Sequence, residues 1–176
     1  MKTFAAILLI SLGGLFTTSI YTQQFTTLSG TPVSLSQYQG KKMLLVNIAS
    51  GSEYAATQIP QLEQLYQQYK DSLVVIAFPS NDFGNESRND ADIKLLLQNT
   101  YHTSFPVSVS TGVKDSTANT HAIYHWLQNQ SENGSMDTKV KKDFQKYLID
   151  KDGTMLGVFS AKTNPMDNAI INAITQ

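Results

Sequence analysis

The sequence predicts an α/β domain whose central β-sheet is mixed in direction and covered by helices on both faces. Two nearly continuous apolar runs, Met43–Ile48 and Leu73–Phe78, are typical of strands buried on both sides. Between them Ile59, Leu62 and Leu65 recur at helical spacing. A strand, a helix and a second buried strand imply parallel pairing through a right-handed crossover. Alternating segments near the C-terminus predict antiparallel strands added to the same sheet.

Composition supports one domain and excludes several classes of function. The chain has 176 residues, of which 41% are hydrophobic and 15% charged, so it is long enough to fold around a core of its own. Thirteen basic and 14 acidic side chains give a net charge of −1, which provides no patch for nucleic acid or an anionic membrane. Cysteine is absent, which excludes disulfides, thiolate metal sites and cysteine nucleophiles.

The N-terminus has the layout of a signal peptide. Lys2 precedes the apolar stretch Phe4–Phe16, and the small polar residues Thr17 and Ser19 provide a small-x-small cleavage site. We therefore assign residues 1–20 to a signal peptide, expect removal of about 19 residues, and expect a periplasmic or extracellular protein. The alternative is an uncleaved membrane anchor, although the stretch is short for a span. Without cysteine the chain cannot be a bacterial lipoprotein.

The elements around the two buried strands follow from their turn chemistry. Thr26–Tyr38 contains a Ser-Gly-Thr-Pro turn between β-prone runs and predicts a hairpin. Pro79–Asn89 is a polar loop, after which Asn89 or Asp90 caps a second helix. That helix places three apolar residues on one face: Ile93, Leu96 and Leu97.

The middle of the chain is less regular. Phe105–Ser110 alternates apolar and polar residues and predicts a short edge strand. Thr120 is expected to cap a short helix that turns Ile123, Trp126 and Leu127 inward. Asn129–Thr138 is expected to be a flexible polar linker.

A hairpin and a helix complete the predicted domain, 25–176. Phe144–Ile149 and Met155–Phe159 flank Asp150-Lys151-Asp152-Gly153, whose glycine can adopt positive φ. Asn164-Pro165-Met166-Asp167 is expected to open the last helix, with Asn164 as its cap. Three isoleucines give that helix an apolar face: Ile170, Ile171 and Ile174.

Ser52 and Glu53 are the first candidates for a functional site. They lie in the small-residue turn between Met43–Ile48 and the first helix. Ligands of such sheets gather at the carboxyl ends of strands, and the free N–H groups that begin a helix favour an anion. The sequence therefore directs attention to this turn.

Four strings, in this order and at this spacing, resemble the glutathione peroxidase family of the thioredoxin fold. The resemblance extends from about Phe25 to the C-terminus and implies a thioredoxin-like fold. The strings are VSLSQYQGKKMLLVNIAS (Val33–Ser50), FPSNDFGNE (Phe78–Glu86), HAIYHWL (His121–Leu127) and FQKYLIDKDG (Phe144–Gly153).

The resemblance also implies where catalytic residues would stand. The family uses a cysteine or selenocysteine in the first turn, a glutamine in the loop after the second strand, and a tryptophan-asparagine pair before the late hairpin. Here these positions match Ser52, Asp82, Lys142 and Asp143. The helix position at which many relatives keep a resolving cysteine matches Leu97 or its neighbour.

These substitutions predict that thiol-dependent peroxide reduction is absent. A serine hydroxyl stays protonated at neutral pH and has no stable oxidised state that a thiol could reduce. Carboxylates at Asp82 and Asp143 would oppose an anion nearby. We therefore expect an exported, non-catalytic relative that needs no cofactor and binds or scaffolds an unidentified protein or small molecule. The membrane is a partner only if the N-terminal segment is uncleaved.

Two alternatives reuse the altered pocket, which by resemblance gathers Ser52, Asp82, Lys142 and Asp143 with Glu53 at its rim. Ser52 and Lys142 could form a serine–lysine hydrolytic pair. Glu53, Asp82 and Asp143 could instead hold an oxygen-liganded cation. The chain's histidines are too few and too scattered for a zinc site and are expected to be structural: His102, His121 and His125.

Overall fold

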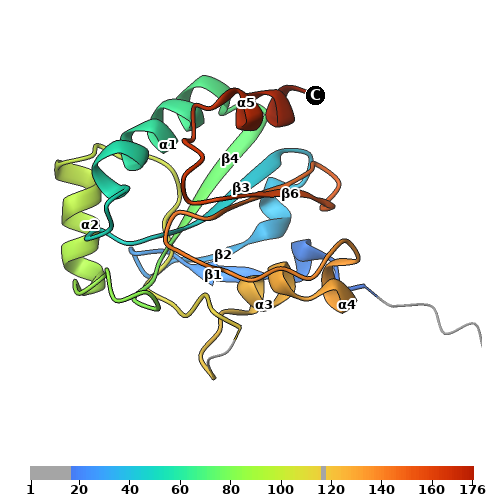
Figure 1. Cartoon of the computed structure of the whole chain (residues 1–176), viewed down its shortest axis with the longest axis horizontal. Coiled ribbons are helices and arrows are strands. Elements are labelled where there is room, and N and C mark those ends of the chain that lie inside the picture. The colour runs from blue at the N-terminus through green and yellow to red at the C-terminus, as the bar shows by residue number, and fades with distance from the viewer. Residues whose placement is uncertain (1–16, 116–117) are drawn as a thin grey trace, which may run out of the picture.

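The computed structural model describes residues 17–115 and 118–176 and contains one four-stranded mixed sheet (Figure 1). The strand order is β4-β3-β5-β6, with β3 parallel to β4 and antiparallel to β5, and β5 antiparallel to β6. The four predicted segments share this sheet, which confirms the predicted fold class. Their bounds are β3 Lys42–Ile48, β4 Leu73–Pro79, β5 Lys146–Ile149 and β6 Met155–Phe159.

Helices cover both faces of the sheet, as predicted. On one face lie α1 (Ala55–Tyr69), α2 (Asp90–Asn99) and α5 (Asn168–Thr175). On the other lie α3 (Ala122–Gln128) and α4 (Gln130–Asn133), which Figure 1 shows across the sheet from α1 and α5. The arrangement is a thioredoxin-like fold.

The central strand β3 contributes to two separate hydrophobic clusters. Leu44 and Val46 pack in the cluster that contains the α1, α2 and α5 side chains, whereas Met43 and Leu45 pack in the cluster that contains those of α3. All four are fully buried. Alternate residues of a strand point to opposite faces, so a strand covered on both sides must be apolar throughout. This is why the run in the sequence is continuous.

A two-stranded sheet lies before β3 and confirms the predicted hairpin. Strand β1 (Gln24–Thr26) pairs antiparallel with β2 (Pro32–Ser34), and Gly30 in the turn has a φ of +81°. Short 3-10 helices flank the pair, η1 (Ile20–Thr22) before it and η2 (Leu35–Tyr38) after it.

Part of the predicted signal segment lies within the described residues. The Thr18 N–H donates to the Glu132 carbonyl at 2.9 Å, and Trp126 Nε1 donates to the Thr18 carbonyl at 2.6 Å. Ile20 is fully buried in the same cluster as Trp126. Residues 1–16, which carry the apolar stretch, lie outside the described residues. Within the described ranges, no helix combines the length and apolar character needed to cross a membrane.

Two predicted helix caps are wrong by one to three positions. His121 caps α3 in place of Thr120, and its Nδ1 accepts the Ile123 N–H at 3.2 Å. Asp167 caps α5 in place of Asn164, and its Oδ1 accepts the Ala169 N–H at 2.8 Å. The Asn164 carbonyl accepts the Asp167 N–H at 3.0 Å, so the Asn-Pro segment forms a turn before the helix.

Two irregular segments also differ from the expectation. The segment Asn129–Thr138, expected to be a flexible linker, contains the short helix α4. Buried Asn133 holds this segment in place by donating to the carbonyls of Trp126 and Met136, each at 3.0 Å. The segment Phe105–Ser110 forms isolated bridges in place of a strand, with Val107 beside Ala77 of β4.

Lys146 of β5 is fully buried, and its three donors are all used on neutral oxygens. Its Nζ donates to Gln58 Oε1 at 2.6 Å and to the carbonyls of Phe144 at 2.7 Å and Thr163 at 2.8 Å. Gln58 Nε2 in turn donates to the Ala161 carbonyl at 2.7 Å. This one amine therefore connects α1, the entry to β5 and the segment that follows β6.

Replacing Lys146 by methionine is expected to lower the free energy of unfolding by about 3 kcal/mol or more, because three buried oxygens lose their donor. Burial lowers the pKa of Lys146 to about 7, from 10.5 in the unfolded chain. Between these two pH values the wild type therefore takes up a proton when it unfolds. The contribution of Lys146 to the free energy of unfolding consequently rises with pH over this range.

Urea denaturation at several pH values tests this expectation. The stability gap between the wild type and Lys146→Met should widen as pH rises from 7 toward 10. Lys70→Met, which alters an exposed lysine, serves as the control. A gap that stays constant with pH would contradict the buried, easily deprotonated amine.

Candidate functional site

Ser52 lies in the turn between β3 and α1, as predicted, and only 8% of its surface is exposed. Its Oγ lies 3.5 Å from the Tyr54 N–H, which it accepts at the start of α1. The preceding Gly51 N–H donates to the Asn85 carbonyl at 2.9 Å. A Cβ at Gly51 would stand 2.7 Å from that oxygen, so the turn requires glycine at this position.

Glu86 fastens this turn to the loop after β4. Glu86 is almost completely buried, with Oε2 accepting the Ser50 N–H and Oε1 the Ser50 hydroxyl, both at 2.7 Å. Arg88 Nη1 also donates to Ser50 Oγ at 2.5 Å. Glu86 stands within the string Phe78–Glu86, and this position was the only indication in the sequence that it has a role.

Asp143 is a fully buried carboxylate with one unsatisfied oxygen. Its Oδ2 accepts a hydrogen bond from Asn85 Nδ2 at 2.6 Å, whereas Oδ1 has no hydrogen-bond partner among the described residues. Burial raises the pKa of Asp143, and the hydrogen bond from Asn85 acts in the opposite direction. Asp143 is thus held in the protein by the same loop that contacts Gly51.

Backbone contacts hold residues 142–144 against the end of β3. The Phe144 N–H donates to the Asn47 carbonyl at 2.6 Å, and Asn47 Nδ2 donates to the Lys142 carbonyl at 3.1 Å. Phe144 has a φ of +65°, which is uncommon for a residue other than glycine. Because Phe144 turns in this way, β5 begins at Lys146 and not at Phe144 as predicted.

Lys142 pairs with Glu53 at the surface. The two side chains are 2.5 Å apart, and Lys142 Nζ lies 5.0 Å from the centre of the Tyr54 ring. Their mutual hydrogen bond raises the pKa of Lys142 and lowers that of Glu53. Within the described ranges no hydrogen bond joins Lys142 to Ser52. The expected serine–lysine pair is therefore not formed, because the lysine is protonated and engaged elsewhere.

The carboxylate of Asp82 forms its hydrogen bonds with a different loop, the 113–114 segment. Its Oδ2 accepts the N–H groups of Val113 at 2.6 Å and Lys114 at 2.8 Å, and the Lys114 amine also donates to the Asp82 carbonyl. No hydrogen bond or ion pair among the described residues joins Asp82 to Ser52 or Asp143. The backbone N–H groups of the 113–114 segment satisfy a carboxylate that was expected to face Ser52.

The expected cation site is not supported by this arrangement. Glu53, Asp82 and Asp143 each have a different partner, namely Lys142, the 113–114 backbone and Asn85. In the part of the chain that the structure describes, no three acidic or histidine side chains are grouped to hold a metal ion.

Two of the histidines have contacts that explain them structurally. His121 caps α3, packs 5.8 Å from the Phe78 ring, and has its pKa lowered by burial. His125 Nδ1 lies 2.8 Å from Glu132 and its Nε2 lies 3.8 Å from Asp115.

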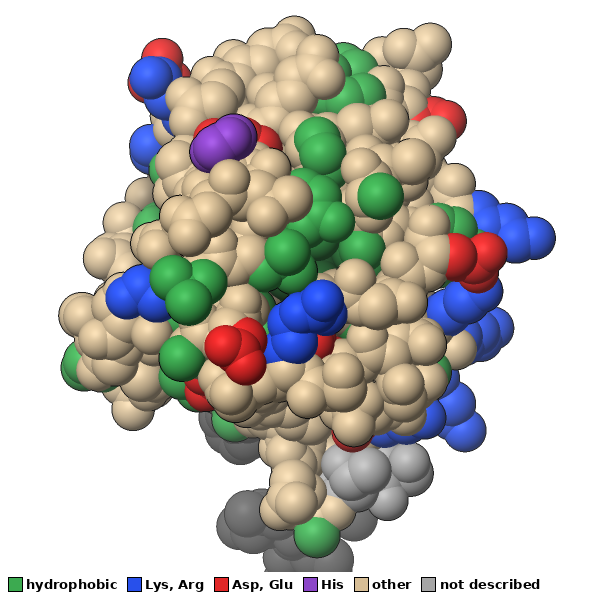
Figure 2. Space-filling view, turned by 90° about the vertical axis from the view of Figure 1, so that its left-hand side faces the viewer, with side chains coloured by type: hydrophobic (Ala, Val, Ile, Leu, Met, Phe, Trp, Pro, Cys, Tyr) green, Lys and Arg blue, Asp and Glu red, His purple; other side chains and the backbone are tan. Residues whose placement is uncertain are grey.

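The site therefore consists of three chain segments that are joined by backbone hydrogen bonds and by the side chains of Asn47, Asn85 and Glu86. Figure 2 shows the end of the molecule at which β3 and β4 terminate, where acidic and basic side chains lie beside one another below a group of hydrophobic side chains. The structure joins Ser52 to Asp143 only indirectly, because Gly51 and Asp143 both contact Asn85.

Comparison with known proteins gives a consistent set of relatives. The sequence profile of the glutathione peroxidase family matches residues 20–128. The chain is 37% identical over 142 residues to a glutathione peroxidase-like peroxiredoxin of Chlamydomonas reinhardtii, covering 80% of this chain and 85% of the relative. It is 31% identical over 163 residues to a glutathione peroxidase homologue of Bacillus subtilis, covering 90% and 99%.

Solved structures show the same likeness. The crystal structure of Trgpx in its apo form matches with a TM-score of 0.67 and 32% identity, covering 90% of this chain and 97% of the other. A thioredoxin-family thiol:disulfide interchange protein of Chlorobium tepidum matches with a TM-score of 0.65 and 16% identity, covering 92% and 98%. The second likeness concerns the fold alone.

Replacing Asp143 by asparagine is expected to stabilise the protein by about 1 kcal/mol at pH 7, because the change removes a buried charge with an unsatisfied oxygen. The folded-state pKa of Asp143 lies above its ordinary value of 3.8. The cost of burying the charged carboxylate of Asp143 is therefore fully present at pH values above the folded-state pKa. This cost disappears below pH 3.8, where the carboxyl group is protonated in both states.

Denaturation curves between pH 7 and pH 3 measure this difference. The advantage of Asp143→Asn should shrink on acidification, while Asp71→Asn, at an exposed acid, should show no such trend. A variant less stable than the wild type at pH 7 would show that the charge of Asp143 is favourable.

Proposed function

The chain belongs to the glutathione peroxidase family, and from this premise we propose that it is an exported member that does not reduce peroxides and acts by binding. One observation carries the proposal. Ser52 stands at the turn where the resemblance places the family's cysteine or selenocysteine, and the whole chain contains no cysteine. No other residue of the protein can supply the missing thiol.

The chemistry of oxygen differs from that of sulfur at this position. Peroxide reduction moves one peroxide oxygen onto the nucleophile. The sulfenate formed in this way condenses with one thiol to a disulfide, releasing water, and a second thiol then regenerates the nucleophile by disulfide exchange. A serine hydroxyl is a poor nucleophile at its ordinary pKa and forms no such reducible state. The sulfur atom that this chemistry requires at position 52 is absent, and its absence is the first support for the proposal.

The other positions that match the family's catalytic residues support the same conclusion. Asp143 is buried and accepts a hydrogen bond from Asn85, and Asp82 accepts two from the 113–114 backbone. Carboxylates accept hydrogen bonds and disfavour a neighbouring anion, so neither can replace a donor that stabilises a thiolate. Lys142, the one cation at these positions, is engaged by Glu53.

Export is proposed from Lys2 and the apolar stretch Phe4–Phe16. The contacts of Thr18 with Trp126 and Glu132 favour a cleavage point that leaves Thr18 in the mature chain. We therefore propose a cut slightly before the position expected from the sequence.

Mass spectrometry of the mature protein from its natural host tests this proposal. The mature chain should begin close to, but not after, Thr18. A chain that begins at Met1 would favour a membrane anchor, and one that begins at Ile20 or later would show that the Thr18 contacts are dispensable.

A coupled peroxidase assay tests the absence of activity, and two variants test its cause. Purified protein with hydrogen peroxide and either glutathione or thioredoxin should show no turnover above the uncatalysed rate. Ser52→Cys alone should also remain near that rate. Adding Asp82→Gln, Lys142→Trp and Asp143→Asn should raise the rate at least about tenfold, or ~1.4 kcal/mol in the barrier.

The three additional changes without Ser52→Cys provide the matched control, which should stay inactive. Thiol-dependent turnover by the unmodified protein would overturn the proposed function. Substantial activity of Ser52→Cys alone would show that the surrounding pocket is still competent, and that only the nucleophile is missing.

A further inference from the structure

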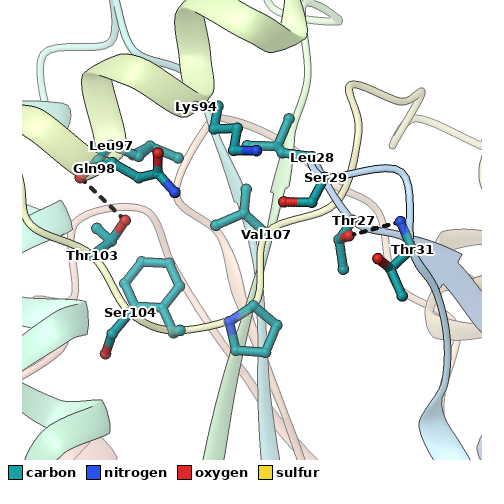
Figure 3. A pocket seen from close by; sticks show the side chains of 12 residues that line it. Thr27, Leu28, Ser29, Thr31, Lys94, Leu97, Gln98, Thr103, Ser104 and Val107 are labelled. Atoms are coloured by element: carbon teal, nitrogen blue, oxygen red, sulfur yellow. Dashed lines mark hydrogen bonds between the residues drawn. The ribbon is translucent and has the colours of Figure 1, made fainter.

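A cavity of about 450 Å³ lies between α2, the turn of the β1–β2 hairpin and residues 103–107. Figure 3 shows it at close range. None of its lining residues is among Ser52, Glu53, Asp82, Lys142 and Asp143, so it is separate from the site described above. Its volume falls in the range of cavities that bind small molecules.

The apolar wall of the cavity is formed by well-fixed residues. Leu97, Phe105 and Val107 are each at least nine-tenths buried. The Leu28 N–H donates to the Val107 carbonyl at 3.0 Å, and the Thr103 N–H donates to the Leu97 carbonyl at 3.0 Å. These backbone bonds connect the hairpin turn and the end of α2 to the segment between them, so the cavity is formed without a ligand.

Three polar groups point into the cavity over Val107. They are the Lys94 amine, the Ser29 hydroxyl and the Gln98 carboxamide, which come from two different elements and converge in Figure 3. Lys94 is only half exposed, and no carboxylate of the described residues forms an ion pair with it.

The acid that contacts the lining residue Ser104 is already hydrogen-bonded. Glu63 of α1 accepts the Ser104 N–H at 2.8 Å and the Ser104 hydroxyl at 2.7 Å, and it also accepts Gln67 Nε2 at 2.8 Å. The Ser104 hydroxyl therefore bonds to Glu63, and Figure 3 shows it turned away from the cavity. Among the described residues, the charge of Lys94 is left without a neutralising carboxylate.

We propose that this cavity binds a small organic monocarboxylate. One ammonium, one hydroxyl and one amide are donors that match the acceptor oxygens of a carboxylate, and the ion pair is strengthened by partial burial. The wall of Leu97, Phe105 and Val107 accommodates a short aliphatic or aromatic body. The inference does not depend on the state of Ser52, because the two sites share no residue.

Titration of the ¹⁵N-labelled full-length protein, followed by amide chemical shifts, tests the proposal. The probes are benzoate, hexanoate and benzyl alcohol, which is the neutral match of benzoate. Both carboxylates should give saturable shifts confined to Leu28, Ser29, Lys94, Gln98 and Thr103. Benzyl alcohol should bind at least about tenfold more weakly than benzoate, as expected for loss of a charge-assisted contact.

Variants separate a built site from general weak binding. Lys94→Met should lower benzoate affinity about tenfold and leave benzyl alcohol unchanged, while Lys70→Met, at an exposed lysine of the neighbouring helix end, should change neither. If Lys94→Met does not fold, Lys94→Gln repeats the test with a good helix former. Unsaturable or scattered shifts, equal binding of benzyl alcohol, or unchanged benzoate affinity in the Lys94 variant would each overturn the proposal.

Discussion

The buried amine of Lys146 is the constraint on which the arrangement around the site depends. A buried lysine is costly unless its donors are satisfied, and here three neutral oxygens satisfy it without a carboxylate. Gln58 extends the connection by donating to the Ala161 carbonyl. Because α1, the entry to β5 and the segment after β6 converge on one nitrogen, the position of the Ser52 turn follows from contacts in the core.

These core contacts explain how the turn after β3 keeps its position without help from the side chain of Ser52. The turn after β3 is held by Gly51 and Ser50 backbone groups, and residues 142–144 are held by contacts between Asn47 and the backbone. None of these bonds uses the side chains of Ser52 or Lys142. Those positions are consequently free to change without unfolding the turn, whereas Gly51 and Glu86 are not.

Sequence reasoning recovered the sheet because continuous apolar runs and glycine turns are local signals that burial then enforces. The caps at His121 and Asp167 were missed because neighbouring Thr120 and Asn164 offer equally good local chemistry. Asp82 was expected to face Ser52, but its carboxylate accepts hydrogen bonds from the backbone N–H groups at residues 113–114, a contact that no local pattern in the sequence indicates. In the sequence, Lys146 is an ordinary polar residue of an alternating strand. Its burial becomes apparent only from the three-dimensional packing.

The pairing of β3 with β5 governs how this chain reaches its native state. Met43 lies opposite Ile149 and Leu44 opposite Leu148, so the central strand takes its second neighbour from far along the chain. Pairings between such distant residues slow folding, and until they form the edge of β3 is open to association with other chains. Synthesis must therefore have passed Ile149 before β3 can gain this second neighbour, so one edge of the central strand stays unpaired until that point.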